Sequence, residues 1–468
     1  MVSNRAANYV WRPSRVSLSQ VLLVFVVLAP GVVFGVLALL WLLGWVPSER
    51  VVSRITGLTF SACVLGLAAL VWKLAVSDGK PAANGAAAVV VAFGNWFAVQ
   101  NYRFPLVLMA DRLSTPFLAL AVVLSGLIGQ FSATYLHRER GFFRFFLLLH
   151  LFAFGSLLAF AAGSFDLLAA GWELVGITSV LLIGFFQLRA DPVENGLRVF
   201  AVYRACDIGL LVGIVAMHQW AGTASFNGGF PMLSGARAVI VCLLLLIAAS
   251  GKAAQVPFSG WLPRAMEGPT PSSAIFYGAI SIHAGAYLLL RAQPLLAQST
   301  LASALVILIG VATAIHGTIA GRASADAKTS LAYASLTQVG VVFVEIGLGW
   351  RSIAVAHILG HATVRTMQFL RAPSMLHDYH QMHSAIGDEI TTGKQFEGLL
   401  PQRVQLWLYR WAFDRGHLDT ILDRWVVDPL LQLSRLFARL DHAGMPRAVS
   451  QPGEVAISIP GPVRQGGD

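Results

Sequence analysis

Long apolar runs separated by short polar segments set the pattern of this sequence. Each run has about 20 residues, which is enough for a helix to cross a bilayer core of about 30 Å. The eleven runs lie near residues 19–45, 56–75, 114–135, 142–162, 165–187, 198–220, 237–256, 272–293, 301–320, 329–349 and 352–371. The pattern therefore predicts an all-α polytopic membrane protein with about eleven transmembrane helices.

One interruption of this pattern falls in the middle of the chain. Lys252 ends the seventh run, and four prolines, at positions 257, 263, 269 and 271, break the backbone before the next run. In lipid, backbone groups freed from a helix are costly, so a broken helix persists only where protein or a watery cavity receives them. The interruption predicts a hydrated path inside a helical bundle.

The segments outside the runs predict other structure. Residues 76–112 contain Gly, Pro and an alternating stretch, which predicts a β-hairpin or short strand at the membrane surface. The segments from Trp407 to Phe413 and from Val426 to Leu440 predict amphipathic helices on the cytoplasmic membrane surface or on a partner. The Pro/Gly-rich sequence from about Gly444 is typical of disorder. We expect three regions, which are residues 1–112, 113–371 and 372–468.

The composition agrees with a membrane protein and argues against soluble classes. Hydrophobic residues make up 56% of the 468 positions, charged residues make up 12%, and the mean hydropathy is +0.68. The net charge of +10 does not indicate nucleic-acid binding, because the cations lie mostly between the runs and near the C-terminus. Cys63, Cys206 and Cys242 each stand alone in an apolar run, so we expect no disulfide framework and no zinc or iron–sulfur site.

The loop charges predict the orientation in the membrane. One side carries the Arg-rich C-terminus and seven loop cations, which are Arg138, Arg140, Arg144, Arg189, Arg264, Arg322 and Lys328. The positive-inside rule assigns this side to the cytoplasm. With an odd number of spans, Arg5, Arg12 and Arg15 near the N-terminus then lie outside, against the same rule.

Nine ionisable residues fall inside the runs, where a charge is costly and usually serves a function. They are Glu173, Arg204, Asp207, Lys252, His283, Glu345, His357, His361 and Arg365. Glu173 lies early in the fifth run and Lys252 ends the seventh. We expect this carboxylate and ammonium to share a pocket in which one added proton upsets both charges, as in a proton switch.

Two further groups share helix faces. Arg204 and Asp207 are three residues apart and form either a structural pair or part of a relay. His357, His361 and Arg365 recur every four residues, and this polar stripe favours a water-linked proton relay. A zinc site on the two histidines is disfavoured, because no third ligand is evident.

Two charges at the ends of the tenth run allow two interpretations each. Glu345 either takes part in the interior chemistry or snorkels to the membrane surface. Lys328, just before the run, is either a loop charge or a member of the relay.

Several motifs resemble the proton-translocating antiporter family, which includes the NuoL subunit of respiratory complex I and the Mrp antiporter subunits. In chain order they are Gly171–Gly176 (GWELVG), Gly251–Pro257 (GKAAQVP), Gly268–Pro271 (GPTP), Leu331–Tyr333 (LAY) and His357–Ala362 (HILGHA). The likeness covers about residues 105–371 and implies a NuoL-type antiporter-like bundle.

Within this family the nearer likeness is to the DabB subunits of bacterial inorganic carbon pumps. It rests on Ser272–Ala279, Ala362–Ser374 and Leu376–His380. The complex I subunit typically has His where Tyr277 stands and Lys where Arg365 stands, and an arginine is a poor proton carrier because it stays charged. The resemblance implies a bacterial inner-membrane complex with a DabA-type zinc subunit, in which a proton or sodium gradient drives conversion of CO₂ to bicarbonate.

The resemblance also implies roles for single residues. Glu173 and Lys252 match the coupling pair, Lys328 the charge that opens the tenth span, and His357 and His361 the central relay. The expected proton path uses Glu173, Lys252, Asp207, Lys328, His357 and His361, and it is tuned by Arg204, Tyr277, His283 and Arg365. Relatives from complex I continue into further spans, so we expect a shorter path or one that a partner completes.

Catalysis is not expected on this chain. Hydration of CO₂ by a metal hydroxide needs a ligand set that the sequence does not offer, so zinc is expected on the partner and no cofactor here. Two other interpretations stay open. One is a NuoL-like proton-pumping subunit of a complex I-type NADH:quinone oxidoreductase, and the other is a cation/proton antiporter subunit or a scaffold whose charges only pair structurally.

Overall fold

Helices account for most of the computed structural model, which describes residues 17–76, 88–99, 102–226, 233–324, 326–386 and 401–444. Ten helical segments in this part are long and apolar enough to cross a membrane. They are α1 (Leu18–Leu42), α2 (Glu49–Val76), α3 (Ser114–Tyr135), α4 (Phe142–Phe160), α5 (Phe165–Ile183), α6 (Ala190–Ala221), α7 (Gly235–Lys252), the segment Thr270–Arg291, α12 (Thr300–Arg322) and α13 (Ala327–Gly347). The eleventh predicted run forms the first part of α14 (Arg351–Ile386). The all-α membrane class is therefore confirmed.

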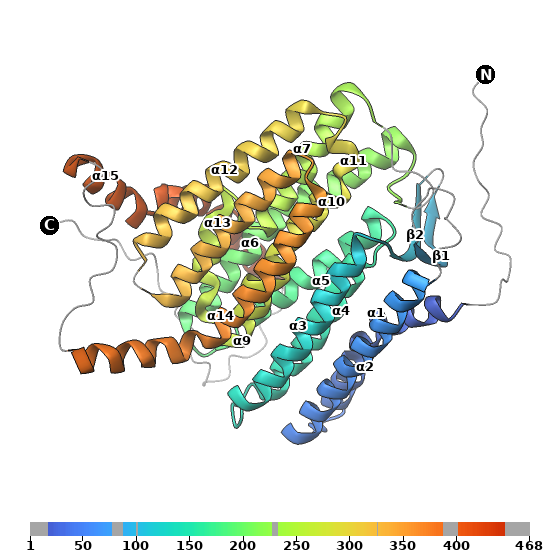
Figure 1. Cartoon of the computed structure of the whole chain (residues 1–468), viewed down its shortest axis with the longest axis horizontal. Helices are drawn as coiled ribbons and strands as arrows, with labels where there is room; N and C mark the ends of the chain where they lie inside the picture. Colours follow the sequence, from blue (N-terminus) through green and yellow to red (C-terminus); the bar gives the residue numbers. More distant parts are fainter. Residues whose placement is uncertain are drawn as a thin grey trace.

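The helices pack into one bundle with the first two spans at one edge (Figure 1). The α1 and α2 helices lie at this edge beside α3 and α4, α12 and α13 lie toward the other edge, and α14 packs between α13 and α3. Between the two edges, α5, α6, α7 and α10 (Ser281–Arg291) enclose large buried side chains such as Trp172, Tyr203 and Tyr287. The interior of the bundle is thus where the predicted intramembrane charges have to be accommodated.

A β-hairpin covers one end of the bundle, as the sequence predicted. Strands β1 (Val89–Val99) and β2 (Tyr102–Ala110) pair antiparallel, with Val89 opposite Ala110 and Val99 opposite Tyr102. The side-chain amide of Gln20 donates to the carbonyl of Val90 at 2.9 Å, which ties the hairpin to the start of α1. We call this end of the bundle the hairpin end.

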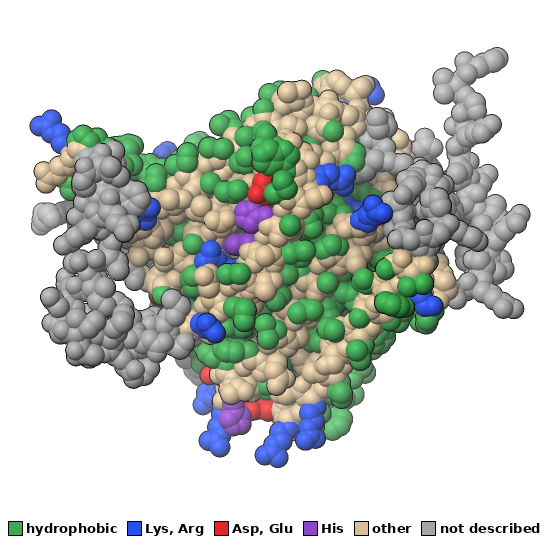
Figure 2. All heavy atoms as spheres, viewed as in Figure 1, with side chains coloured by type: hydrophobic (Ala, Val, Ile, Leu, Met, Phe, Trp, Pro, Cys, Tyr) green, Lys and Arg blue, Asp and Glu red, His purple; other side chains and the backbone are tan. Residues whose placement is uncertain are grey.

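The opposite end carries the loop cations. Successive spans run in opposite directions, so the end of α12 and the starts of α6 and α13 all lie away from the hairpin. Arg189, Arg322 and Lys328 are at these positions. Figure 2 shows basic side chains gathered along the bottom edge of the molecule. We call this end the basic end, and Arg5, Arg12 and Arg15 lie outside the described residues.

The predicted interruption is confirmed as a discontinuity within the bundle. After α7 the chain forms η1 (Phe258–Gly260), α8 (Trp261–Arg264) and η2 (Ala265–Glu267), and then α9 (Thr270–Ser273), the π-helical turn η3 (Ala274–Ala279) and α10. Protein groups receive freed backbone atoms. The indole of Trp261 donates to the carbonyl of Gly251 at 3.0 Å, and the amide of Val256 donates to the hydroxyl of Thr313 at 3.0 Å.

The C-terminal part forms the predicted helices. The two predicted segments lie mainly in α15 (Gln402–Phe413) and α17 (Asp428–Gly444). Between them are η5 (Arg415–His417), α16 (Leu418–Leu422) and η6 (Asp423–Val427). Elsewhere in the chain, a short helix α11 (Gln293–Leu296) precedes α12. Asp419 accepts hydrogen bonds from Arg264 at 2.7 and 3.1 Å, and Asp423 pairs with Arg198. The segment is therefore anchored to α6 and to the discontinuity. The predicted disorder from about Gly444 concerns residues 445–468, which lie outside the described part.

Candidate functional site

One cluster of charges joins α5 to α6, in which Asp207 is buried and Glu173 and Arg204 are half-buried. Arg204 forms ion pairs with Glu173 on α5 and with Asp207 one turn along its own helix, the latter at 2.7 Å. Asp207 is 3% exposed, and its other carboxylate oxygen accepts a hydrogen bond from the indole of Trp172 at 2.5 Å. Two carboxylates thus share one guanidinium, so protonation of either one changes the pairing of the other.

Lys252 lies beside this cluster without a direct ion pair to Glu173. Lys252 is 1% exposed, and its ammonium group donates a hydrogen bond to the backbone carbonyl of Trp172 at 3.2 Å. The ammonium also lies 4.2 Å from the ring centroid of Tyr203 and 4.8 Å from that of Trp172, where aromatic faces stabilise a cation.

Arg204 reaches across from α6 and pairs with the Glu173 carboxylate, so Glu173 and Lys252 lie in one cluster without a direct ion pair between them. Space for the lysine comes from Gly176, one turn after Trp172. A Cβ atom built on Gly176 would lie 2.8 Å from the Lys252 ammonium nitrogen.

A second cluster joins three helices through histidines. Nε2 of His283 on α10 lies 3.0 Å from Nδ1 of His361 on α14. The ring of His361 lies 6.4 Å from that of His357, centroid to centroid. His357 in turn contacts Glu345 at 2.9 Å through Nδ1 and the side chain of Gln338 at 3.0 Å through Nε2. The stripe predicted on α14 is thus part of a row of titratable groups.

For His283 and Glu345 in this row, the structure adds contacts that the sequence did not predict. His283, expected only to tune the path, hydrogen-bonds to His361 and is itself a member of the row. Glu345 does not snorkel to the surface. It is 9% exposed and pairs with His357, because α13 and α14 run antiparallel and bring the end of one beside the start of the other.

Three other predicted residues lie apart from these contacts. Arg365 lies one turn beyond His361 on α14, toward the basic end, and its Nε is buried without a hydrogen-bond partner among the described residues. Lys328 lies in the first turn of α13, about 15 Å along the helix from Gln338. Tyr277 lies in the π-helical turn η3, and its side chain is outside the described part.

Buried hydroxyl groups flank the two clusters. Ser250 lies two residues before Lys252, Ser281 lies two residues before His283, and Tyr203 stacks its ring against the Lys252 ammonium. The hydroxyl of Ser250 is buried and has no hydrogen-bond partner among the described residues, whereas the buried hydroxyls of Tyr203 and Ser281 interact with each other. A buried hydroxyl without a partner is usually satisfied by internal water, so this part of the bundle offers a site for a hydrated connection.

Sequence reasoning missed a polar cluster at the hairpin end. Asp166, at the start of α5, accepts a hydrogen bond from the hydroxyl of Tyr102 at 2.9 Å and lies 3.0 Å from Nε2 of His218 at the end of α6. The carboxylate of Asp111 pairs with Arg291 at 2.6 Å. The sequence does show these ionisable residues near the ends of apolar runs. It does not show which ends of the runs lie next to one another in the fold.

Comparison with known families agrees with this arrangement. Residues 162–391 match the family model described as NADH:quinone oxidoreductase/Mrp antiporter, TM, and residues 96–146 match the N-terminus of complex I chain 5. By these matches the chain is similar to the antiporter-like membrane subunits of complex I and of Mrp antiporters. The matched segments include both charge clusters, so the clusters lie within the part of this antiporter-like subunit that it shares with its relatives.

Individual relatives of this antiporter-like subunit show how far the likeness extends. NADH-quinone oxidoreductase subunit L of Mycobacterium tuberculosis H37Rv is 35% identical over 291 residues, which is 61% of this chain and 46% of that protein. NADH-ubiquinone oxidoreductase chain 5 of Metridium senile is 34% identical over 273 residues, 58% of this chain and 46% of that protein. A chain in the structure of the Mrp complex from Dietzia sp. DQ12-45-1b superposes with a TM-score of 0.61 and 26% identity, covering 74% of this chain and 37% of that one. The antiporter-like subunit thus matches less than half the length of these relatives.

Proposed function

We propose that this antiporter-like subunit conducts protons, or sodium ions, across the membrane through its two buried clusters. The observation that carries the proposal is the succession of ionisable groups inside the bundle, from Glu173 and Arg204 past Lys252 to His283, His361 and Glu345. Burying this many charges costs free energy that simple hydrophobic packing would avoid. A translocation path gives a physical reason to keep them.

The first cluster can respond to a single proton. When Glu173 is ionised, Arg204 is shared between two carboxylates. A proton on Glu173 removes one of these partners, so Arg204 is left with Asp207, and the electrostatic field at the neighbouring Lys252 becomes more positive. The lysine can then release its proton toward the buried hydroxyls of Ser250 and Tyr203.

The second cluster can pass that proton onward. An imidazole accepts a proton at one nitrogen and releases another from the opposite nitrogen, which suits a chain of neighbouring rings. His283 and His361 are already in hydrogen-bond contact, and Glu345 holds His357 in a fixed orientation. Arg365 keeps its charge and makes a second cation on His361 unfavourable, so that a proton moves on rather than staying.

The flux is proposed to drive chemistry on another polypeptide. On the resemblance of Ser272–Ala279 and Ala362–Ser374 to DabB subunits, the partner is a DabA-type zinc protein that hydrates CO₂ to bicarbonate. Among the described residues of this chain, no group of three or more His, Cys, Asp or Glu is placed to hold a metal ion. Each proton crossing the membrane supplies about 2.3 kcal/mol per 100 mV, which can bias hydration by more than tenfold.

A second function is favoured by the names of the relatives. Both curated relatives above are subunits of NADH:quinone oxidoreductases, so this chain is alternatively a proton-translocating subunit of such a complex. A third possibility is a cation/proton antiporter subunit, as the Mrp likeness suggests. All three functions use the same buried clusters and differ in what is coupled to them.

Affinity purification of the full chain from its native membrane, followed by reconstitution of the purified complex in vesicles, separates these functions. Under an imposed pH gradient, the carbon-pump proposal expects gradient-dependent conversion of CO₂ to bicarbonate and zinc in a copurifying subunit. Quinone reduction by NADH, with iron–sulfur subunits present, would overturn it in favour of the redox complex. Na⁺/H⁺ exchange with neither activity would favour the antiporter.

A further inference from the structure

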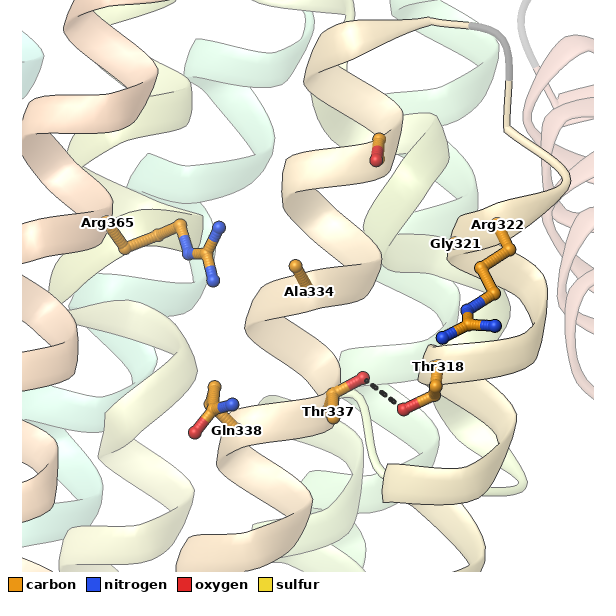
Figure 3. Close-up of a pocket in the computed structure, with 9 residues that line it drawn as sticks. Thr318, Gly321, Arg322, Ala334, Thr337, Gln338 and Arg365 are labelled. Carbon is orange, nitrogen blue, oxygen red and sulfur yellow. Dashed lines mark hydrogen bonds between the residues drawn. The ribbon is translucent and has the colours of Figure 1, made fainter. Parts of the chain in front are cut away.

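An open groove of about 300 Å³ lies over α13, between α12 and α14 (Figure 3). Its floor includes the small side chain of Ala334, and its walls include Arg322 from α12 and Arg365 from α14. In Figure 3 the Arg365 guanidinium points toward α13 and that of Arg322 lies over Thr318. The groove therefore has a permanently charged arginine on each side and a small side chain at its base.

The groove suits an anionic ligand. Its other polar lining groups include Thr318, Ser330 and Gln338, and none of the described lining residues is acidic. Nε of Arg365 is buried and has no hydrogen-bond partner among the described residues. Guanidinium groups bind phosphate oxygens with strong, charge-assisted hydrogen bonds, and a phosphate is therefore a well-matched occupant.

The register between α13 and α14 shows where the groove lies along the length of the bundle. His357 on α14 contacts Gln338 on α13 at 3.0 Å, and these helices run antiparallel. Moving eight residues along α14 to Arg365, and eight back along α13 to Ser330, covers about 12 Å on each helix. Arg365 is thus level with the first turn of α13, and Arg322 is the last residue of α12. Both arginines therefore lie toward the basic end of the bundle.

An apolar stripe continues from the groove into the bilayer. Leu308, Val311 and Ile315 are exposed, and their spacing of three and four residues continues through Thr318 to Arg322. Residues at this spacing share one face of a helix. The face of α12 that carries Arg322 therefore leads from a cationic groove to an apolar surface, which matches a head group followed by acyl chains.

We propose that this groove binds an anionic phospholipid, with its phosphodiester held by Arg322 and Arg365 and its acyl chains lying along Leu308, Val311 and Ile315. Basic pockets between transmembrane helices commonly hold anionic lipid head groups. Inorganic phosphate shares the head-group chemistry but has no chains to lie on the apolar stripe. An acidic side chain of a partner subunit would use the same cations, but it would not need the stripe.

The test measures lipid bound by the purified full chain. The delipidated protein is titrated with short-chain phosphatidylglycerol, phosphatidylcholine and inorganic phosphate, and retained ligand is counted by native mass spectrometry. The expected order is phosphatidylglycerol well above phosphatidylcholine, with no retained phosphate. Arg322→Gln and Arg365→Gln each weaken phosphatidylglycerol binding by about tenfold, and binding falls with added salt. Arg351→Gln is the matched control, because this exposed arginine begins α14 at the hairpin end.

Three results would overturn the proposal. They are equal retention of the two lipids, unchanged phosphatidylglycerol binding in both groove variants, and inorganic phosphate that displaces the lipid at equal concentration. A structure of the complex with a partner carboxylate between Arg322 and Arg365 would likewise replace the lipid by a protein contact. If one variant fails to fold, the other variant and the salt dependence still decide the outcome.

Discussion

Nε2 of His283 lies 3.0 Å from Nδ1 of His361, so that α10, which follows the helix discontinuity, hydrogen-bonds to α14 within the bundle. One ring must donate and the other accept, which leaves room for one shared proton but not for two charged rings. The contact connects α10 to the row formed by His361, His357 and Glu345. The α10 helix also packs against α7, which ends at Lys252, so it lies between the two clusters of the proposed path.

We expect His283→Gln to lower gradient-driven proton flux by about tenfold or more, because a glutamine amide keeps a hydrogen bond but cannot take up and release protons. Flux is measured with a pH-sensitive dye inside liposomes that contain the purified complex. His150→Gln is the matched control, since His150 is equally buried but bonds to Thr56 at the α2 edge of the bundle. Equal loss of flux in both variants would point to a general packing defect.

Gly176→Ala tests the space around Lys252. The added methyl group would lie 2.8 Å from the ammonium nitrogen, so the lysine has to move from its place beside Trp172 and Tyr203. We expect assembly to persist and flux to fall several-fold, with overpacking costing about 1–3 kcal/mol of stability. The control is Gly57→Ala, where no atom lies within 4 Å of the new methyl group. Normal flux in the Gly176 variant would show that the position of the ammonium is unimportant.

Stability at acidic pH tests the ion pair at the hairpin end. Burial alone would raise the pKa of Asp111, but hydrogen bonds from Arg291 and Ser114 lower it below its usual range. A carboxyl whose pKa is lowered by folding stabilises the protein at pH values above its ordinary pKa of about 4. This contribution is lost as the pH falls through the folded-state pKa. The melting temperature of the wild type should therefore fall as the pH is lowered from about 5 to about 2.

The variant Asp111→Asn should lack this acid transition and should lose about 3 kcal/mol of unfolding free energy at neutral pH, because it leaves the nearly buried Arg291 unpaired. Thermal melts across the pH range provide the measurement. The exposed Asp191 supplies the control Asp191→Asn. An identical pH profile for wild type and Asp111→Asn would exclude a stabilising role for the pair.

Anchoring of the C-terminal segment depends on Asp419. Its carboxylate accepts from Arg264 in the discontinuity and from Arg415 at 3.1 Å. We expect Asp419→Asn to increase amide hydrogen exchange in α16 by about tenfold, because the loss of a charge-assisted bond favours local opening. Asp428→Asn, at an exposed position on α17, should leave exchange in α16 unchanged. Unaltered exchange in the Asp419 variant would indicate that apolar packing alone holds this segment.

The sequence was sufficient for features that depend on local pattern. Hydrophobic runs located the spans, prolines 257 to 271 located the discontinuity, and the alternating segment near residue 90 located the hairpin. Contacts between helices depend on long side chains whose directions the pattern does not fix. Arg204 could reach either Asp207 or Glu173, and the structure shows that it pairs with both and thereby keeps Glu173 from Lys252.

The same limit explains the missed cluster at the hairpin end. Tyr102, Asp166 and His218 lie on a strand and two helices, and they meet only because the hairpin folds over the ends of α5 and α6. The sequence identified both His283 and His361 as intramembrane residues, but it did not indicate that these two rings, 78 positions apart, are in contact. Register between non-consecutive helices is therefore what the structure adds to the sequence.

Proton flux through Lys252→Met tests the central claim most directly. Methionine keeps the length and apolar character of the side chain but cannot carry a proton, and the exposed Lys73 supplies the control Lys73→Met. The complex is reconstituted in liposomes under an imposed pH gradient, and its assembly is checked by size-exclusion chromatography. The account predicts that Lys252→Met assembles normally and has no flux above empty liposomes, whereas Lys73→Met matches the wild type. Wild-type flux through Lys252→Met would contradict it.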